Sequence, residues 1–100
     1  MEKILIIKKK PGQEPEIEPA FENSLSALQE AVGGYIETVT FASNACVVCN
    51  EEGLLLGLPY NCNFLGCDFF VTILIVGVKG ENFSSLRSAT IPQLMKALKG

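Results

Sequence analysis

The sequence predicts a single α+β domain, in which a small antiparallel or mixed sheet of about five strands has two short helices packed on it. Three observations lead to this prediction. The chain has 100 residues, of which 48% are hydrophobic and 19% charged, values typical of one folded domain with one core. Short apolar stretches with the spacing of strands occupy most of the chain, and two segments show helical spacing instead. Neither a linker nor an internal repeat divides it, so we expect the domain to span residues 1–100.

The first third of the chain is expected to contain a strand, a loop and a helix. Residues 3–8 are apolar on both faces and are followed by a Pro-Gly pair, which predicts a strand. Residues 13–21 are acidic and include two prolines, so we expect an extended, looping segment. Asn23 or Ser24 can cap a helix that runs to about Val32, where two glycines supply a left-handed stop.

The middle of the chain is expected to consist mainly of strands. Residues 35–41 alternate between outward and inward side chains as a strand does. Residues 45–58 are expected to form a hairpin whose polar turn lies at 50–53. Residues 59–68 are rich in Asn, Gly and Cys, and we expect them to be irregular. Residues 69–77 give the strongest strand signal in the chain.

The last element is expected to be a helix that begins at Thr90. Thr90 and Gln93 have the spacing of a capping box, in which each side chain bonds to the backbone amide of the other residue. Pro92 suits the first turn, where it loses no helical hydrogen bond. The apolar face of this helix comprises Ile91, Leu94, Met95 and Leu98. If the box forms, Thr90→Ala should lower the stability by about 1 kcal/mol.

The distribution of apolar residues predicts self-association. The strand over residues 69–77 is apolar on both faces, as is the run Ile4–Ile7, and such strands need cover on both faces. Two short helices are expected to cover one face only. Curling of the sheet, the loop at residues 13–22 or a second protomer must then close the other face. We expect a two-fold homodimer, which light scattering would distinguish from a monomer.

The charge balance argues against nucleic acid as a partner. Acidic residues outnumber basic ones by 11 to 8, and the formal net charge is −3. Binding to phosphates depends on neutralisation by Lys and Arg, so this balance is unfavourable. The single basic run, Lys8-Lys9-Lys10, is interpreted as a solvated strand end.

The sequence also predicts a cytoplasmic protein without a membrane partner. The apolar run Ile4–Ile7 is too short for a signal peptide, and no small-residue cleavage site follows it. The longest apolar run, residues 69–78, is far shorter than the roughly 20 residues that span a bilayer. Four cysteines without a secretory signal indicate reduced thiols.

The cysteines have a spacing that superficially suits a tetrahedral zinc site. Cys46, Cys49, Cys62 and Cys67 read C-x2-C-x12-C-x4-C. Zinc, a redox Cys-x-x-Cys pair and small buried hydrophobes are the three interpretations, and the third is favoured. The residues between the first two cysteines are both valines, which prefer a strand, and positions three apart in a strand face opposite sides. We therefore expect no metal, no cofactor and no disulfide.

The chain contains no histidine, which removes the commonest general base at neutral pH and all His-dependent nucleophilic chemistry. The carboxylate pair Glu51-Glu52 lies in the expected hairpin turn and is interpreted as a solvated tip. Gly33-Gly34 follows a helix instead of preceding one, so it is interpreted as a helix C-cap and not as a phosphate loop. We expect a protein that is not an enzyme and has no catalytic residues.

The apolar stretch over residues 54–60 is open to two interpretations. Its leucines are either core residues or part of an interaction surface to which Tyr60 contributes an amphipathic ring. The possible interaction surface that follows from the second interpretation comprises Asn50, Glu51, Glu52, Leu55, Tyr60, Asn61 and Asp68.

Three stretches of the chain resemble one family. These are residues 28–37, with the pattern VGGYIE, residues 50–61, with NEEGLLLGLPYN, and residues 76–77 together with 81–86. They resemble the small proteins of bacteria, phages and conjugative elements catalogued as domain of unknown function 3846. The resemblance spans nearly the whole chain and implies an accessory role on a mobile genetic element, with counter-defence as one form of it. The four cysteines match no motif of that family.

Two functions are therefore expected from different classes. The first is a non-enzymatic interaction module that binds a host protein. The alternative is a binding or sequestering protein for a small, nucleotide-type ligand. This alternative would use backbone amides and the segment Asn61–Asp68, because no basic cluster is apparent.

Overall fold

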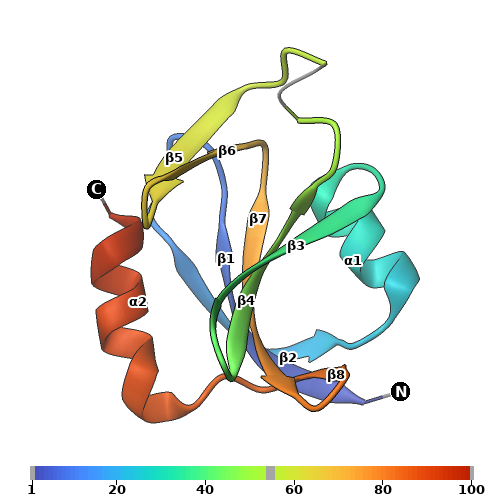
Figure 1. The fold of residues 1–100 in the computed structure, drawn as a ribbon, viewed down its shortest axis with the longest axis vertical. Helices are drawn as coiled ribbons and strands as arrows, with labels where there is room; N and C mark the ends of the chain where they lie inside the picture. Colours follow the sequence, from blue (N-terminus) through green and yellow to red (C-terminus); the bar gives the residue numbers. More distant parts are fainter. Residues whose placement is uncertain (1, 54–55, 100) are drawn as a thin grey trace.

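The computed structural model describes residues 2–53 and 56–99. Its centre is a six-stranded sheet in the order β2-β1-β7-β4-β3, with β8 also paired to β7, and a separate β5–β6 hairpin packs over one face (Figure 1). All pairings in the described part are antiparallel, which confirms the α+β class. The strands are β1 (Lys3–Lys9), β2 (Glu16–Glu22), β3 (Ile36–Ala42), β4 (Ala45–Asn50), β5 (Tyr60–Phe64), β6 (Cys67–Phe70), β7 (Ile73–Lys79) and β8 (Asn82–Ser84).

The helix α1 (Leu25–Val32) begins and ends where the sequence predicts. The Ser24 Oγ accepts a hydrogen bond from the Ala27 N–H at 3.2 Å, which satisfies one of the free amides of the first turn. Gly33 adopts a left-handed conformation with φ 79° and donates its N–H to the Gln29 carbonyl. Local capping therefore defines this helix.

The helix α2 (Ile91–Leu98) forms as expected, but the capping box at Thr90 was a wrong prediction. A short 3-10 helix, η1 (Ser88–Thr90), precedes α2, so Thr90 is itself helical. Its Oγ1 and its N–H both donate to the Arg87 carbonyl, at 2.8 and 3.0 Å, and its side chain makes no capping hydrogen bond, because a capping residue needs extended backbone. In the described part of the chain, no helix is long and apolar enough to cross a membrane.

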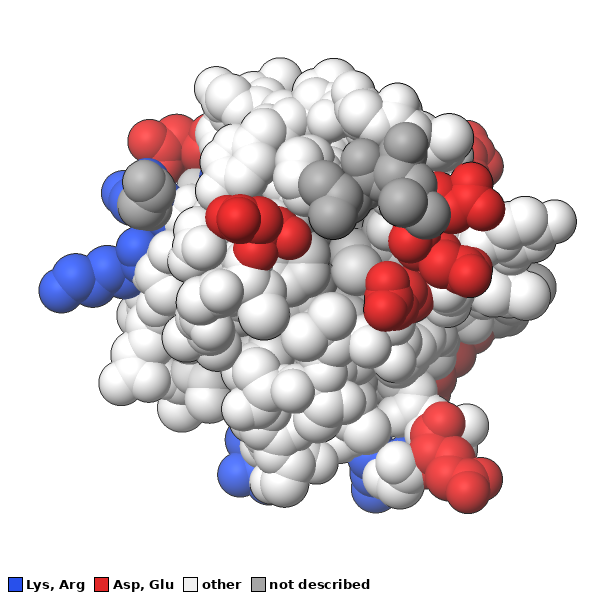
Figure 2. All heavy atoms as spheres, turned by 45° about the horizontal axis from the view of Figure 1, so that its top comes forward, with Lys and Arg blue, Asp and Glu red and all other residues white. Residues whose placement is uncertain are grey.

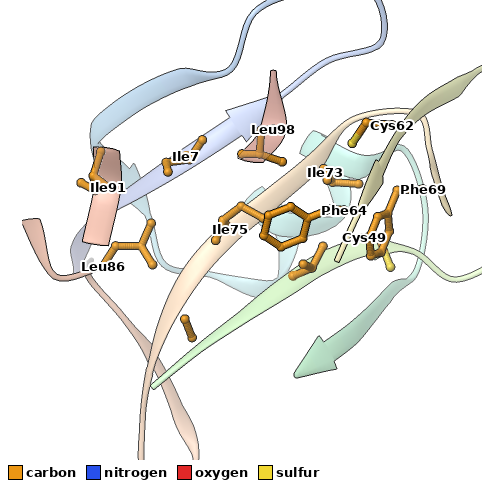
Figure 3. Close-up of a cluster of buried hydrophobic side chains, with 12 residues drawn as sticks. Ile7, Cys49, Cys62, Phe64, Phe69, Ile73, Ile75, Leu86, Ile91 and Leu98 are labelled. Atoms are coloured by element: carbon orange, nitrogen blue, oxygen red, sulfur yellow. The ribbon is translucent and has the colours of Figure 1, made fainter. Parts of the chain in front are cut away.

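The central sheet is buried on both faces by elements of this chain. Alternate side chains of β7 point to opposite faces, so Ile73 and Ile75 join one core and Leu74 and Val76 the other. We call the cluster with Ile73 and Ile75 the α2 core, because α2 and the β5–β6 hairpin cover it (Figure 3). We call the cluster with Leu74 and Val76 the α1 core, because α1 covers it. Figure 1 shows the two helices on opposite sides of the sheet.

This arrangement changes the argument for a dimer. The expectation that both helices cover the same face was wrong, because α1 contacts β3, β4 and β7 on one face while α2 contacts β1 and β5 on the other. The hairpin fills the remainder of the α2 face through Cys62, Phe64 and Phe69. No open sheet face remains in the described part to require a second protomer. The dimer itself stays a prediction that light scattering would test.

The segment from residue 69 to 77 is not one strand. Val71 has φ 52°, a conformation that is sterically unfavourable for a β-branched residue, and it separates β6 from β7. The Val71 N–H donates to the Pro59 carbonyl at 2.7 Å, and this bond closes the base of the hairpin. Residues 60–70, expected to be mostly irregular, thereby pair as β5 and β6.

The prediction of a hairpin over residues 45–58 was also wrong. β4 pairs with β3 along one edge and with β7 along the other, so both of its edges are occupied. Leu56 and Gly57 lie in a turn, and the expected positions Leu54 and Leu55 are outside the described residues. β4 forms its hairpin with β3 instead, and both strands match the expected ones to within one residue at either end.

Two further strands pair where loops were expected. Residues 16–22 form β2 along the edge of β1, and Pro19 lies where a bulge shifts the register between Phe21 and Glu18. A proline lacks an N–H, and an edge bulge is a position that tolerates this loss. The sequence also favours a loop from Gly80 and Asn82 onward, where β8 instead pairs with the end of β7.

Candidate functional site

The residues predicted as an interaction surface fall into groups with different roles. Asn50 and Asn61 use their amides to hold the fold together. Tyr60 and Asp68 form a polar network on the β5–β6 hairpin. Glu51 and Glu52 are exposed just after β4, and Leu55 lies outside the described residues.

Asn50 connects the end of β4 to α1. Its Nδ2 donates to the Val32 carbonyl at 3.1 Å, and its Oδ1 accepts from the Glu52 N–H at 2.8 Å. The side chain therefore satisfies a free carbonyl at the end of α1 and shapes the turn that displays Glu51. Asn50 positions the surface and is not a free recognition group.

Asn61 connects the hairpin to the central sheet. Its Nδ2 donates to the Lys9 carbonyl at 2.8 Å and to the Val71 carbonyl at 2.6 Å, while its Oδ1 accepts from Lys9 Nζ at 3.1 Å. All of its strong hydrogen-bonding positions face the protein. Asn61 thus holds β5 against β1 and stabilises the strained residue Val71.

Tyr60, Asn63 and Asp68 form an exposed network across the hairpin. Asp68 Oδ1 accepts from Tyr60 Oη at 2.9 Å and from Asn63 Nδ2 at 3.0 Å. These donors favour the charged carboxylate, so the bonds from Asn63 and then Tyr60 lower the pKa of Asp68. The same bond raises the pKa of Tyr60 because Tyr60 must keep its proton to donate.

The network predicts a loss of stability in acid. The pKa of Asp68 is below its ordinary 3.8 in the folded state, so its contribution is present above about pH 4 and is lost as the pH falls through the lowered pKa. We expect the Tyr60 ring resonances to titrate with a midpoint below 3.8. Asp68→Asn should abolish this titration and flatten the decline of melting temperature below about pH 4. Identical acid profiles for the two proteins would contradict the network.

A groove runs between β3 and β6. It consists of two adjoining pockets of about 260 and 320 Å³ that share Val39, Cys67 and Phe69. β3 ends the sheet, and among the described residues it pairs only with β4, so its outer edge offers unpaired backbone groups. We call this feature the β3 groove.

The β3 groove has an apolar floor and an acidic rim. Val39 and Phe69 supply the floor, and the exposed Glu37, Glu51 and Asp68 line one of the two pockets. No Lys or Arg lines either pocket in the described part of the chain. On the face shown in Figure 2, acidic side chains lie near the centre and along the right side, whereas Lys and Arg lie at the left and lower margins. The arrangement suits a ligand with apolar and cationic groups.

Leu65 extends the groove at the tip of the hairpin. It lines the second pocket and is 64% exposed, with φ 52° in a two-residue turn whose other residue, Gly66, has φ 85°. Two positive φ values define a type I′ turn, which favours Asn-Gly. A leucine there is both strained and exposed, so neither the turn nor the core explains it.

The cysteines divide as the strand geometry requires. Cys46 joins the α1 core and Cys49 the α2 core, which confirms that they face opposite sides of β4. Burial, with smaller contributions from Glu37 and Cys46, raises the pKa of Cys49 to about 11, so it is a protonated thiol at neutral pH. Cys62 is buried, but Cys67 is exposed, and its expected burial was wrong. All four are free thiols, and the described residues contain no cluster of three or more metal-binding side chains.

Two features of the site escaped the sequence analysis. Glu37 and Val39 were interpreted only as alternating strand residues, because their place on a sheet edge depends on which strands pair. Lys9 was interpreted as part of a solvated strand end, yet it is only 6% exposed. Its position in phase with Ile7 on β1 was the one available signal, since alternate strand residues share a face.

The comparisons with known proteins give one match. The family model described as "Domain of unknown function (DUF3846)" matches residues 1–99. No curated protein and no solved structure matches the chain.

Proposed function

The chain belongs to the family of domain of unknown function DUF3846, and from the β3 groove we propose that it is a non-catalytic protein-interaction module that binds an extended, basic segment of a partner protein. The observation that carries this proposal is a free sheet edge beside an apolar floor with an acidic rim. Each of these three properties recognises a different part of such a segment.

The main chain of the segment would add a strand to the edge of β3. Strand addition supplies backbone hydrogen bonds, and pockets beside the edge select alternate side chains. An apolar side chain of the segment would enter the groove over Val39 and Phe69. Lys or Arg at neighbouring positions would meet Glu37, Glu51 and Asp68. The same rim repels phosphates, which is consistent with a protein partner and not a nucleic acid.

The setting of this function follows the family resemblance. We place the protein in the cytoplasm, as an accessory protein of a phage or other mobile genetic element whose partner is a host protein. Counter-defence is one role that such binding would serve. The proposal for the groove does not depend on this setting, because it rests on the surface of the chain alone.

The experiment selects partners from a displayed library of random twelve-residue peptides on the immobilised protein. We expect enriched peptides to alternate apolar residues with Lys or Arg, and their binding to weaken with added salt. The variant Glu37→Lys/Glu51→Lys should weaken binding roughly tenfold or more, since it reverses two charges of the rim. The control Glu30→Lys/Glu81→Lys changes the net charge equally at exposed positions outside the groove and should bind normally. Acidic peptides, or equal weakening in both variants, would overturn the proposal.

A second variant separates binding from folding. Leu65→Asn places Asn-Gly in the type I′ turn and should raise the stability by about 1 kcal/mol. It also removes an exposed apolar side chain from the groove, so peptide binding should fall several-fold. A more stable protein with unchanged peptide affinity would exclude Leu65 from the binding surface.

A further inference from the structure

Lys9 is the only charged side chain in the buried part of the described structure, and its partners are neutral. Its Nζ donates to the Lys10 carbonyl at 2.9 Å and to Asn61 Oδ1 at 3.1 Å. The ion pairs of the described residues join Lys8 with Glu18 and Lys99 with Glu14, and neither includes Lys9. A buried ammonium without a counter-charge is energetically unfavourable, because burial removes its hydration. The amine has three donors, so one remains beyond the two bonds.

An open pocket of about 510 Å³ adjoins this ammonium. β5 forms one wall through Asn61 and Asn63, and the turn after β1 forms another through Gly12 and Gln13. The end of α2 supplies the remaining side. The pocket shares no lining residue with the β3 groove and meets it where Tyr60 and Asn63 donate to Asp68, so the argument for this site does not use the proposed function.

We propose that the pocket beside Lys9 binds the anionic group of a small molecule, a carboxylate or phosphodiester that carries a single negative charge. The Lys9 ammonium supplies the central charge-assisted hydrogen bond, and the bound oxyanion is the counter-charge that the described protein lacks at this position. The Asn63 amide donates one N–H to Asp68, and its second N–H is a further donor at the wall.

The charges of the lining favour a single negative charge on the ligand. Lys9 and Lys99 contribute two positive charges and Glu14 one negative charge, which leaves a net charge of +1. The exposed Lys99 Nζ and Glu14 Oε2 lie 3.9 Å apart at the rim, so their charges partly neutralise one another. A multiply charged phosphate would therefore have only one buried cation to pair with, beside a rim of mixed charge. A ligand with a single negative charge fits this lining better.

The test is a titration followed by NMR of the backbone amides. Sodium acetate and sodium dimethyl phosphate are the probes for the carboxylate and the phosphodiester, with sodium chloride added to hold the ionic strength constant. We expect at least one probe to shift the amides of Gly12, Gln13 and Asn63 saturably, with a Kd on the order of 1–10 mM. The probe that binds more tightly identifies the group. Acetamide and trimethyl phosphate, the neutral analogues, should cause no saturable shift.

Variants connect the shifts to Lys9. Lys9→Met keeps the length of the side chain and should raise Kd roughly tenfold or more, because it removes a charge-assisted hydrogen bond. Lys10→Met makes the same charge change on an exposed neighbour and should bind as the parent does. If Lys9→Met does not fold, Lys99→Met replaces it, with an expected twofold to fivefold weakening. Absence of saturable shifts with both anions, equal shifts with the neutral analogues, or unchanged binding in the pocket variant would overturn the proposal.

Discussion

Asn61→Ala is expected to lower the free energy of unfolding by about 3 kcal/mol, through the loss of three hydrogen bonds at once. The carbonyls of Lys9 and Val71 would lose their partner, and the buried Lys9 ammonium would keep only one protein acceptor. Each buried polar group left without a partner costs about 1–3 kcal/mol, and burial of a charge makes the penalty larger. The hairpin would also lose its tether to β1.

Urea unfolding followed by circular dichroism measures this effect. Asn63→Ala is the matched control, because it removes the same side chain from the same strand but loses only one exposed hydrogen bond, to Asp68. We expect the control to change the free energy of unfolding by less than about 1 kcal/mol. Equal effects of the two substitutions would contradict a structural role for Asn61.

Gly77→Ala is expected to destabilise the fold by roughly 3 kcal/mol or more, because the new methyl group would collide with backbone. An added Cβ would lie 2.8 Å from the Ser85 carbonyl carbon and 2.9 Å from the Ser84 oxygen, and closer still to the Ser85 oxygen. Gly77 pairs with Ser84 in the β7–β8 ladder and lies opposite Ala45 of β4. A backbone held on both sides cannot move away as a flexible side chain would.

The control for this substitution is Gly80→Ala. An added Cβ at Gly80 would meet nothing within 4 Å, so only its left-handed φ of 64° opposes alanine. The expected loss of stability is about 1 kcal/mol. Thermal unfolding of both variants compares a steric collision with a conformational penalty. A loss at Gly77 no larger than that at Gly80 would show that β8 can shift to make room.

The sequence by itself determined the elements whose signals are local. Ser24 and Gly33 define α1 because each makes its capping bond within one helical turn. The strands β3 and β4 follow from alternation and β-branched residues, and the same strand geometry places Cys46 and Cys49 on opposite faces. It also placed residues 1–99 in a family, although it could assign that family no activity.

Tertiary structure alone decided the elements that depend on contacts between distant residues. Nothing local favours a positive φ at Val71, which is held by a bond to Pro59 and by the Asn61 amide. That break turns one expected strand into two and creates the β5–β6 hairpin. Thr90 shows the same limit, because the preceding 3-10 turn gives it a helical backbone, whereas a capping box needs an extended one.

The same distinction between local signals and tertiary contacts applies to the candidate sites. The local sequence could identify Glu51, Tyr60 and Asp68 as exposed polar groups near an apolar segment, because such groups are rarely buried. It could not identify β3 as the free edge or Lys9 as a buried cation, because strand order and burial arise when segments far apart in the chain pair and pack. Lys9 and Asn61 are 52 positions apart, and only the folded chain brings the ammonium and the amide together.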